Sequence, residues 1–162
     1  MRSAAGQICK SFGAKVIGLA GSDSKCRLCV DKYGYDAMIN YKTMEVGAEL
    51  EKHKPFHGFY DNTGGPSAAE IKARLVDGAH IAKVGSIAGA DGYVEDARFT
   101  IASFYAGGCV DKWPGAIKAM AGLIADGKLK FDETILNGID QYPHAMLGLM
   151  AGRNEGKMLV QV

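Results

Sequence analysis

The chain has 162 residues, a formal net charge of +1, 48% hydrophobic residues and 23% charged residues. This length and composition are typical of one soluble globular domain and exclude a mainly disordered chain. The near-neutral charge offers no basic surface for nucleic acid or anionic lipid, and no apolar run reaches the roughly 18 residues that a membrane helix needs. We therefore expect a single domain over residues 1–162 that binds neither nucleic acid nor membrane.

Helix-like and strand-like segments alternate along the chain, separated by short turns. We expect helices at residues 3–12, 24–33, 43–52, 68–75, 114–126 and 143–150, and strands at residues 14–20, 37–40, 58–62, 79–84, 99–105 and 157–162. Gly13 suits the position that ends the first helix, and Asp23 suits the N-cap of the second. Strands that alternate with helices in this way form parallel sheets with helices on both faces. The sequence therefore predicts an α/β fold with a doubly wound parallel sheet.

Four cysteines in a chain of this size favour a reducing compartment, so we expect a cytoplasmic protein. Cys26 and Cys29 form a C-x-x-C pair, which could be half of a zinc site, a redox pair or two small side chains near one helix face. The scattered histidines supply no second pair of zinc ligands, and the cysteines fall one turn inside the expected helix rather than at its start. The third interpretation is favoured, and we expect no metal site.

Ligands of parallel α/β sheets bind at the carboxyl ends of the strands. Ser22 and Lys25 follow the first predicted strand and combine a hydroxyl, a cation and free backbone N–H groups, an arrangement that binds phosphate. No acidic residue directly follows that strand to accept from a ribose hydroxyl, which favours a 2′-phosphate. Each such residue alone could be an ordinary surface or turn residue. Their collection at one edge of one sheet indicates a nucleotide site.

Four motifs stand in a characteristic order and spacing: Gly21-Ser22-Asp23-x-Lys25, Asn40-Tyr41-Lys42-Thr43, Phe59-Tyr60-Asp61-Asn62-x-Gly64-Gly65 and Gly152-Arg153-Asn154-x-Gly156-Lys157. They resemble the cofactor-binding half of the zinc-independent medium-chain dehydrogenase/reductases. Within these the chain is most similar to the leukotriene B4 dehydrogenase/prostaglandin reductase group, which includes alkenal double-bond reductases. The resemblance implies a Rossmann-like fold, NADP(H) as cofactor, no metal and a homodimer. It implies hydride transfer to the C=C bond of an α,β-unsaturated ketone or aldehyde.

The same resemblance assigns residues to the cofactor. Lys25, with Ser22 nearby, would hold the adenosine 2′-phosphate, and Tyr41 would contact the same end. Asn62 would lie beside the dinucleotide. The remaining positions would follow the ribose and nicotinamide: Val84, Gly85, Ser86 and Ile87 along the ribose–nicotinamide segment, Phe104, Tyr105 and Ala106 beside the ring, and Asn154, reaching the ring from the C-terminal end.

The chain departs from the family at its start. The separate catalytic domain has no counterpart, and the glycine-rich turn is reduced to Ser3-Ala4-Ala5-Gly6-Gln7. In the strand order 3-2-1-4-5-6 the first strand is central and would be missing. We expect the strands at 14–20 and 79–84 to present unpaired edges in the middle of the sheet.

No catalytic residue is assigned from the sequence. The loop at residues 89–96 is shorter than in the family, and Asp96 stands where many members carry a tyrosine that orients the substrate carbonyl. Tyr93 is the candidate replacement. We expect an NADPH-dependent oxidoreductase, or its cofactor-binding fragment, with little activity by itself. The alternatives are a non-catalytic nucleotide-binding or protein-interaction module, and an open sheet edge that accepts a strand from another protein.

Overall fold

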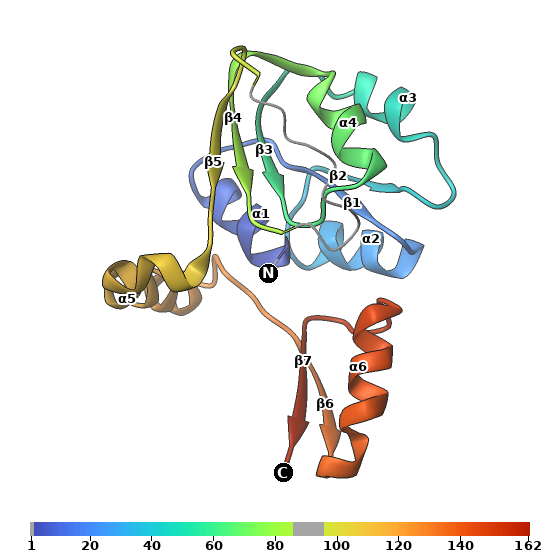
Figure 1. Ribbon diagram of the computed structural model, residues 1–162, viewed down its shortest axis with the longest axis vertical. Helices are drawn as coiled ribbons and strands as arrows, with labels where there is room; N and C mark the ends of the chain where they lie inside the picture. The colour runs from blue at the N-terminus through green and yellow to red at the C-terminus, as the bar shows by residue number, and fades with distance from the viewer. Residues whose placement is uncertain (1, 86–95) are drawn as a thin grey trace. The chain divides into compact units, whose positions relative to one another are not determined.

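The computed structural model describes residues 2–85 and 96–162 (Figure 1). They divide into two compact units, residues 1–38 together with 120–162, and residues 39–119. Each unit has strands and buried side chains of its own.

The first unit starts with two helices and two strands. These elements are α1 (Arg2–Ser11), β1 (Ile17–Ala20), α2 (Asp23–Asp31) and β2 (Ala37–Asn40), which ends just inside the second unit. β1 and β2 form a two-stranded sheet. Tyr35 is buried against the backbone of α1 and β1, because a Cβ atom on Gly6 would lie 2.1 Å from its side chain and one on Gly18 would lie 2.8 Å from it. Two glycines thus allow one large ring to join a helix to a strand.

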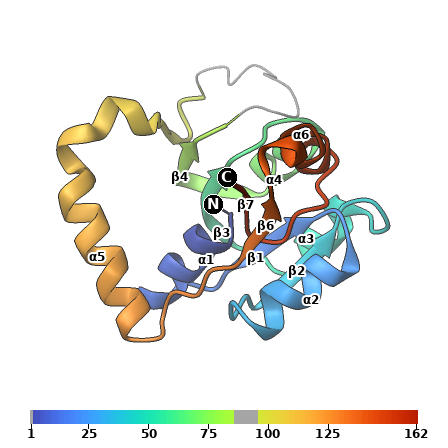
Figure 2. The ribbon, with the colours of Figure 1, turned by 90° about the horizontal axis from the view of Figure 1, so that it is seen from below.

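The C-terminal part of the chain belongs to the same unit. It contains the end of α5 (Trp113–Ala125), then β6 (Glu133–Asn137), the short 3₁₀-helix η2 (Ile139–Gln141), α6 (Tyr142–Met150) and β7 (Lys157–Gln161). β6 and β7 pair in parallel, with Glu133 opposite Lys157. α6 lies beside β7 (Figures 1 and 2), and a Cβ atom on Gly148 would meet the Met158 methyl group at 3.5 Å.

The second unit is built on a three-stranded parallel sheet in the order β3-β4-β5. Its elements are α3 (Val46–Glu51), β3 (Phe56–Asp61), α4 (Pro66–Lys72), β4 (Leu75–Lys83), β5 (Thr100–Ser103), the 3₁₀-helix η1 (Ala106–Lys112) and the start of α5. The core of this sheet consists of four buried residues, Leu75, Ala79, Ile81 and Phe99, with Phe56, Phe59, Ile71, Val76 and Ile101 packed against them. The predicted α/β class with parallel strands is confirmed.

The structure differs from the prediction in where elements begin. α4 ends at Lys72 and Leu75 already belongs to β4, although we expected a helix to Leu75 and a strand only from residue 79. β4 accommodates this length with an irregularity: Gly78 has a φ of +80° and donates its N–H to the Arg98 carbonyl, and the pairing with β3 shifts register between Phe56 and Gly58. β6 was not expected at all, because five residues with three exposed side chains give a weak strand pattern.

The predicted open edge at residues 79–84 is wrong. β4 is the central strand of its sheet, hydrogen-bonded to β3 on one side and to β5 on the other. In the described part of this sheet the edge strands are β3 and β5. The prediction took the strand at 79–84 as the fourth in the order 3-2-1-4-5-6. With the first strand missing, β1, β2 and β3 are the second, third and fourth strands, so the strand expected next to the missing one is β3.

Among the helices that the structure describes, none has the length and apolar character of a membrane span.

Candidate functional site

The turn between β1 and α2 carries the first predicted phosphate-binding residues. Ser22 is the N-cap of α2, with extended backbone (φ −158°, ψ 151°), and its Oγ accepts a hydrogen bond from the Lys25 backbone N–H at 3.4 Å. Its Oγ also lies 3.1 Å from that of Ser24. We had expected Asp23 to cap this helix. Asp23 is instead the first helical residue, because the extended conformation that a cap requires falls one residue earlier.

The Lys25 side chain reaches across the first unit to the C-terminal segment. Its Nζ donates to the Gly152 carbonyl oxygen. The described residues place no carboxylate in an ion pair with Lys25, whereas Lys10 and Lys32 each pair with an aspartate. A carbonyl oxygen carries no formal charge, so its hydrogen bond leaves the positive charge of Lys25 without a counter-charge. We call Ser22, Lys25 and Gly152 the Lys25 corner.

Gly152 has this position because it terminates α6. Its φ is +66°, its N–H donates to the Leu149 carbonyl at 3.0 Å, and the N–H of Arg153 donates to the Gly148 carbonyl at 2.8 Å. This pair of bonds is a Schellman motif, which favours glycine because an L side chain is strained at positive φ. Gly13 ends α1 with the same pair of bonds, as predicted from the sequence.

Asn154 follows two residues after Gly152. Its Nδ2 donates to the Gly156 carbonyl at 2.7 Å, within its own loop. The family resemblance assigns Lys25 and Asn154 to opposite ends of the cofactor, whereas the Lys25–Gly152 contact brings their segments together in one unit. The role of Asn154 at the nicotinamide stays a prediction.

In the second unit, Asp61 organises the strand ends. It is 2% exposed, and its Oδ1 accepts the N–H groups of Thr63 at 2.9 Å and Gly64 at 2.8 Å. Its carbonyl accepts the N–H of Val84 at 2.7 Å, which ties the end of β3 to the end of β4. Sequence analysis missed this role of Asp61, although an Asp just before Thr63-Gly64 is a recognisable turn signal.

Asn62 and Gly85 meet where these strands end. A Cβ atom on Gly85 would lie 2.4 Å from the Asn62 carbonyl oxygen, so only glycine allows this approach. The Asn62 side chain is half-buried and hydrogen-bonds to none of the described residues. Tyr41, after β2, is 44% exposed. These two predicted cofactor residues therefore remain open to a ligand.

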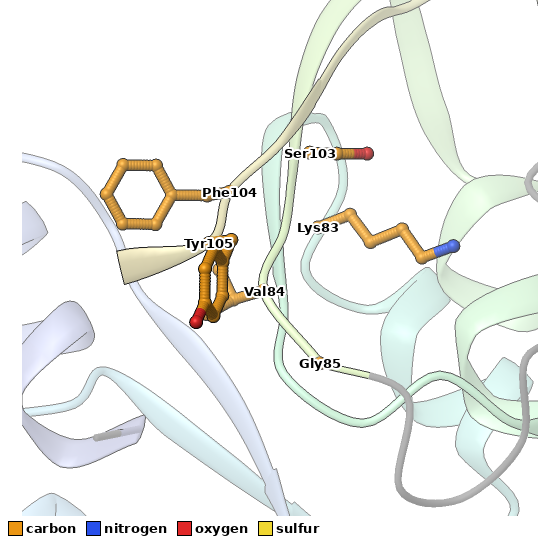
Figure 3. A pocket seen from close by; sticks show the side chains of 6 residues that line it. All are labelled: Lys83, Val84, Gly85, Ser103, Phe104 and Tyr105. Carbon is orange, nitrogen blue, oxygen red and sulfur yellow. The ribbon is translucent and has the colours of Figure 1, made fainter. Parts of the chain in front are cut away.

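A pocket of about 230 Å³ lies at the ends of β4 and β5. Six residues line it: Lys83, Val84, Gly85, Ser103, Phe104 and Tyr105. The Phe104 N–H donates to the Lys83 carbonyl at 2.8 Å, which holds the two strand ends together. Figure 3 shows Phe104 and Tyr105 on one side of these strand ends, and Lys83 and Ser103 on the other. Four predicted residues, Val84, Gly85, Phe104 and Tyr105, are thus brought together.

The two aromatic rings of the pocket are largely exposed, Phe104 by 50% and Tyr105 by 78%. The Tyr105 ring lies over η1, where a Cβ atom on Gly107 would lie 2.7 Å from it. Exposed ring faces beside a glycine suit the stacking of a flat heteroaromatic ligand.

Some predicted residues cannot be placed. Ser86, Ile87 and Tyr93 lie outside the described residues, as does most of the predicted loop at 89–96. Ala106 is the first residue of η1.

Cys26 and Cys29 lie one turn apart on α2 as free thiols. Burial raises the pKa of both thiols, and the neighbouring Asp23 carboxylate further raises the pKa of Cys26. A raised thiol pKa makes a poor thiolate at neutral pH, which disfavours the redox interpretation. Within residues 2–85 and 96–162, no three His, Cys, Asp or Glu side chains gather as metal ligands. The described residues therefore do not form a zinc site.

Comparison with known proteins defines the class. The zinc-binding dehydrogenase family matches residues 3–122, and the chain belongs to this family. It is 33% identical to prostaglandin reductase 1 of Sus scrofa over 174 residues, which cover 98% of this chain and 53% of that protein. The chain thus spans about half the length of the curated relatives it matches. The predicted resemblance to the prostaglandin reductase group is confirmed.

Solved structures of similar proteins share the fold of this chain. CurA from Vibrio vulnificus, crystallised in complex with NADPH, is 29% identical and superposes with a TM-score of 0.89 over 99% of this chain and 53% of that one. The NADPH complex of Escherichia coli quinone oxidoreductase gives a TM-score of 0.84 at 21% identity, with 99% of this chain and 53% of that one covered, which shows the shared fold. The predicted Rossmann-like fold is confirmed.

Proposed function

We propose that this chain is the NADP(H)-binding half of an oxidoreductase that reduces the C=C bond of α,β-unsaturated ketones and aldehydes. One observation carries the proposal: Lys25, on the helix that follows β1, holds a positive charge that no described carboxylate pairs with, and its backbone N–H donates to the Ser22 hydroxyl. The family membership and the NADPH bound to CurA support it.

The Lys25 corner suits the adenosine 2′-phosphate. A phosphate monoester carries a charge between −1 and −2 at neutral pH, so it gains from a lysine that no carboxylate neutralises. Ser22 adds a hydroxyl donor. The adenosine ribose of NADH has no 2′-phosphate and would leave the Lys25 charge without its partner.

The second unit offers residues for the other end of the cofactor. Val84 and Gly85 would line the ribose–nicotinamide segment, and Phe104 and Tyr105 would flank the ring. Bound NADPH would supply a hydride to the β-carbon of the substrate. Tyr93 stays the candidate for orienting the substrate carbonyl. We also propose that the protein works without zinc, as a cytoplasmic homodimer, on a small-molecule enone or enal.

The test is a fluorescence titration of the chain with NADPH and NADH, for the wild type and Lys25→Ala. A charge-assisted contact predicts about a tenfold preference of the wild type for NADPH, which Lys25→Ala should largely remove. Lys15→Ala is the matched control, because Lys15 is exposed and forms no ion pair with a described residue. If the wild type bound NADPH and NADH with equal affinity, the only role left for Lys25 would be to cap the C-terminus of α6.

Two further measurements separate the finer parts of this proposal. Elemental analysis should find no stoichiometric zinc; its presence would contradict the metal-free assignment. Binding of NADPH without any oxidation of it in the presence of enals or enones, even by a chain extended to the length of the relatives, would favour the non-catalytic nucleotide-binding alternative.

A further inference from the structure

The C-terminal segment, which we define as residues 128–162, is joined to both ends of α2. In the first turn of this helix, the Lys25 Nζ donates to the Gly152 carbonyl oxygen. Just after the helix ends, the Tyr33 hydroxyl donates to the Asp132 carboxylate. All four residues belong to the first unit. The position of the Lys25 side chain therefore depends on the C-terminal segment.

The loop that accepts the Lys25 hydrogen bond is fixed by its own contacts. Beyond the Schellman bonds at its start, Thr134 on β6 makes two hydrogen bonds to Glu155, donating from Oγ1 to its carbonyl at 2.6 Å and accepting its N–H at 3.1 Å. At the end of the loop, a Cβ atom on Gly156 would lie 1.8 Å from the Asp132 carbonyl oxygen. The backbone of residues 152–156 therefore has one defined path.

The Lys25 ammonium gains a defined position from this contact. A lysine side chain has many rotamers, and holding its ammonium at one point costs conformational entropy. The Gly152 carbonyl lies at the C-terminal end of α6, where the partial negative charge of the helix attracts a cation. An ammonium has three N–H donors, so the bond to Gly152 leaves two of them for an anion. The contact thus holds a cation whose remaining donors can bind phosphate oxygens.

We propose that the C-terminal segment positions the Lys25 ammonium for the adenosine 2′-phosphate and is itself stabilised when this phosphate binds. This inference rests on the proposed NADP(H) site. It extends that site beyond the part of the chain that the family match covers, residues 3–122. Coupling between two sites is reciprocal: if a fixed segment strengthens phosphate binding, bound phosphate must stabilise the segment by the same factor.

The sign of the effect distinguishes this arrangement from competition. If Gly152 and the phosphate competed for the Lys25 ammonium, phosphate binding would release the carbonyl and loosen the segment. Simultaneous binding predicts the opposite, because the ammonium then bridges the carbonyl oxygen and the phosphate.

The first experiment measures amide hydrogen exchange of the whole chain by mass spectrometry, with 2′,5′-ADP and with 5′-AMP, which lacks the 2′-phosphate. The informative peptides cover residues 148–157, where the N–H groups of Gly152 and Arg153 close the Schellman motif. Saturating 2′,5′-ADP should slow exchange there about fivefold more than 5′-AMP does. Lys25→Ala should speed exchange in the ligand-free chain and abolish the response. Lys15→Ala is the matched control and should behave as the wild type, because Lys15 is exposed and forms no ion pair with a described residue.

The second experiment tests the reciprocal effect by loosening the segment away from Lys25. Thr134→Val keeps the shape of the side chain but removes the Oγ1 atom that bonds twice to Glu155. It should weaken 2′,5′-ADP about fivefold and leave 5′-AMP unchanged. Ser11→Ala is the control, because it removes an exposed hydroxyl that bonds only to the Ile8 carbonyl within α1, and it should change neither ligand. Circular dichroism with a thermal melt checks the fold of each variant.

These measurements separate the coupling from the function on which it rests. A wild type that prefers 2′,5′-ADP to 5′-AMP, with exchange at residues 148–157 unchanged or faster on binding, overturns the coupling alone. Equal weakening of both ligands by Thr134→Val also overturns it, because the segment would then support the fold and not the phosphate site. A wild type that binds 2′,5′-ADP no better than 5′-AMP overturns both proposals.

Discussion

The three-stranded sheet and the C-terminal segment of residues 128–162 are stabilised in different ways. In the sheet, β4 buries Leu75, Ala79 and Ile81 against Phe99. The C-terminal segment buries fewer apolar residues: Leu129 and, on α6, Ala145 and Gly148. It is instead joined to the rest of its unit by polar contacts.

Polar contacts at three of its residues connect the segment to α1, to α2 and to the two residues that follow α2. Gln7, 3% exposed, donates to the Lys130 carbonyl at 2.8 Å and accepts the Lys130 N–H at 2.7 Å. Lys32 and Tyr33 both donate to the Asp132 carboxylate, and Lys25 donates to the Gly152 carbonyl. The burial of apolar side chains is non-directional, whereas hydrogen bonds require defined distances and angles and so fix individual residues in place. The polar region is therefore the one that can position Lys25.

The largest expected effect is on the apolar region. Ile81→Ala removes a side chain that is 1% exposed at the centre of β4, and should lower the free energy of unfolding by about 2–5 kcal/mol. Urea denaturation measures this. Ile139→Ala, at a position 68% exposed, is the control and should cost less than about 0.5 kcal/mol. Equal effects would mean that the sheet has no apolar core of its own.

A smaller effect is expected where the apolar sheet meets the pocket. Gly85→Ala places a Cβ atom 2.4 Å from a backbone oxygen, which cannot rotate away, and should cost about 1–3 kcal/mol. Gly115→Ala, on α5 with nothing within 4 Å of the new Cβ, should be neutral or slightly stabilising. If Gly85→Ala were silent in thermal melts, the close approach to Asn62 would not be needed for this strand end.

The smallest loss of stability is expected for a substitution in the polar region, and this loss should depend on pH. Tyr33→Phe removes the hydroxyl that donates to Asp132 and should cost about 1 kcal/mol at pH 7. The exposed Tyr142, changed to Phe, is the control.

The pH profile identifies the partner of Tyr33. Hydrogen bonds from Lys32 and then Tyr33 lower the pKa of Asp132 below its ordinary value. A carboxyl with a lowered pKa stabilises the fold above its unfolded pKa of about 4, and this stabilisation disappears as the pH falls through the folded pKa. The difference between wild type and Tyr33→Phe should therefore shrink in acid. A difference that stayed constant down to the lowest pH at which the chain folds would show that Asp132 is not the partner.

Several features of the candidate site were predictable from local sequence. Ser22 and Lys25 stand directly after an apolar strand, and Val84, Gly85, Phe104 and Tyr105 stand at two more strand ends, so their types and positions already indicated a ligand site. Asp61 was missed because its role depends on accepting backbone N–H groups, although the turn residues after it gave a signal. The N-cap was shifted by one residue because both Ser22 and Asp23 have side chains that can cap a helix.

The sequence by itself determined the alternation of helices and strands, the parallel α/β class and the glycine that ends α1, because these follow from periodicity and from local backbone preferences. Only the tertiary structure decided that β4 lies between β3 and β5 and that β6 pairs with β7. It alone brought Lys25 to Gly152. Such contacts join residues far apart in the chain, and no local pattern records them, because they arise when separate elements bury and satisfy each other's surfaces.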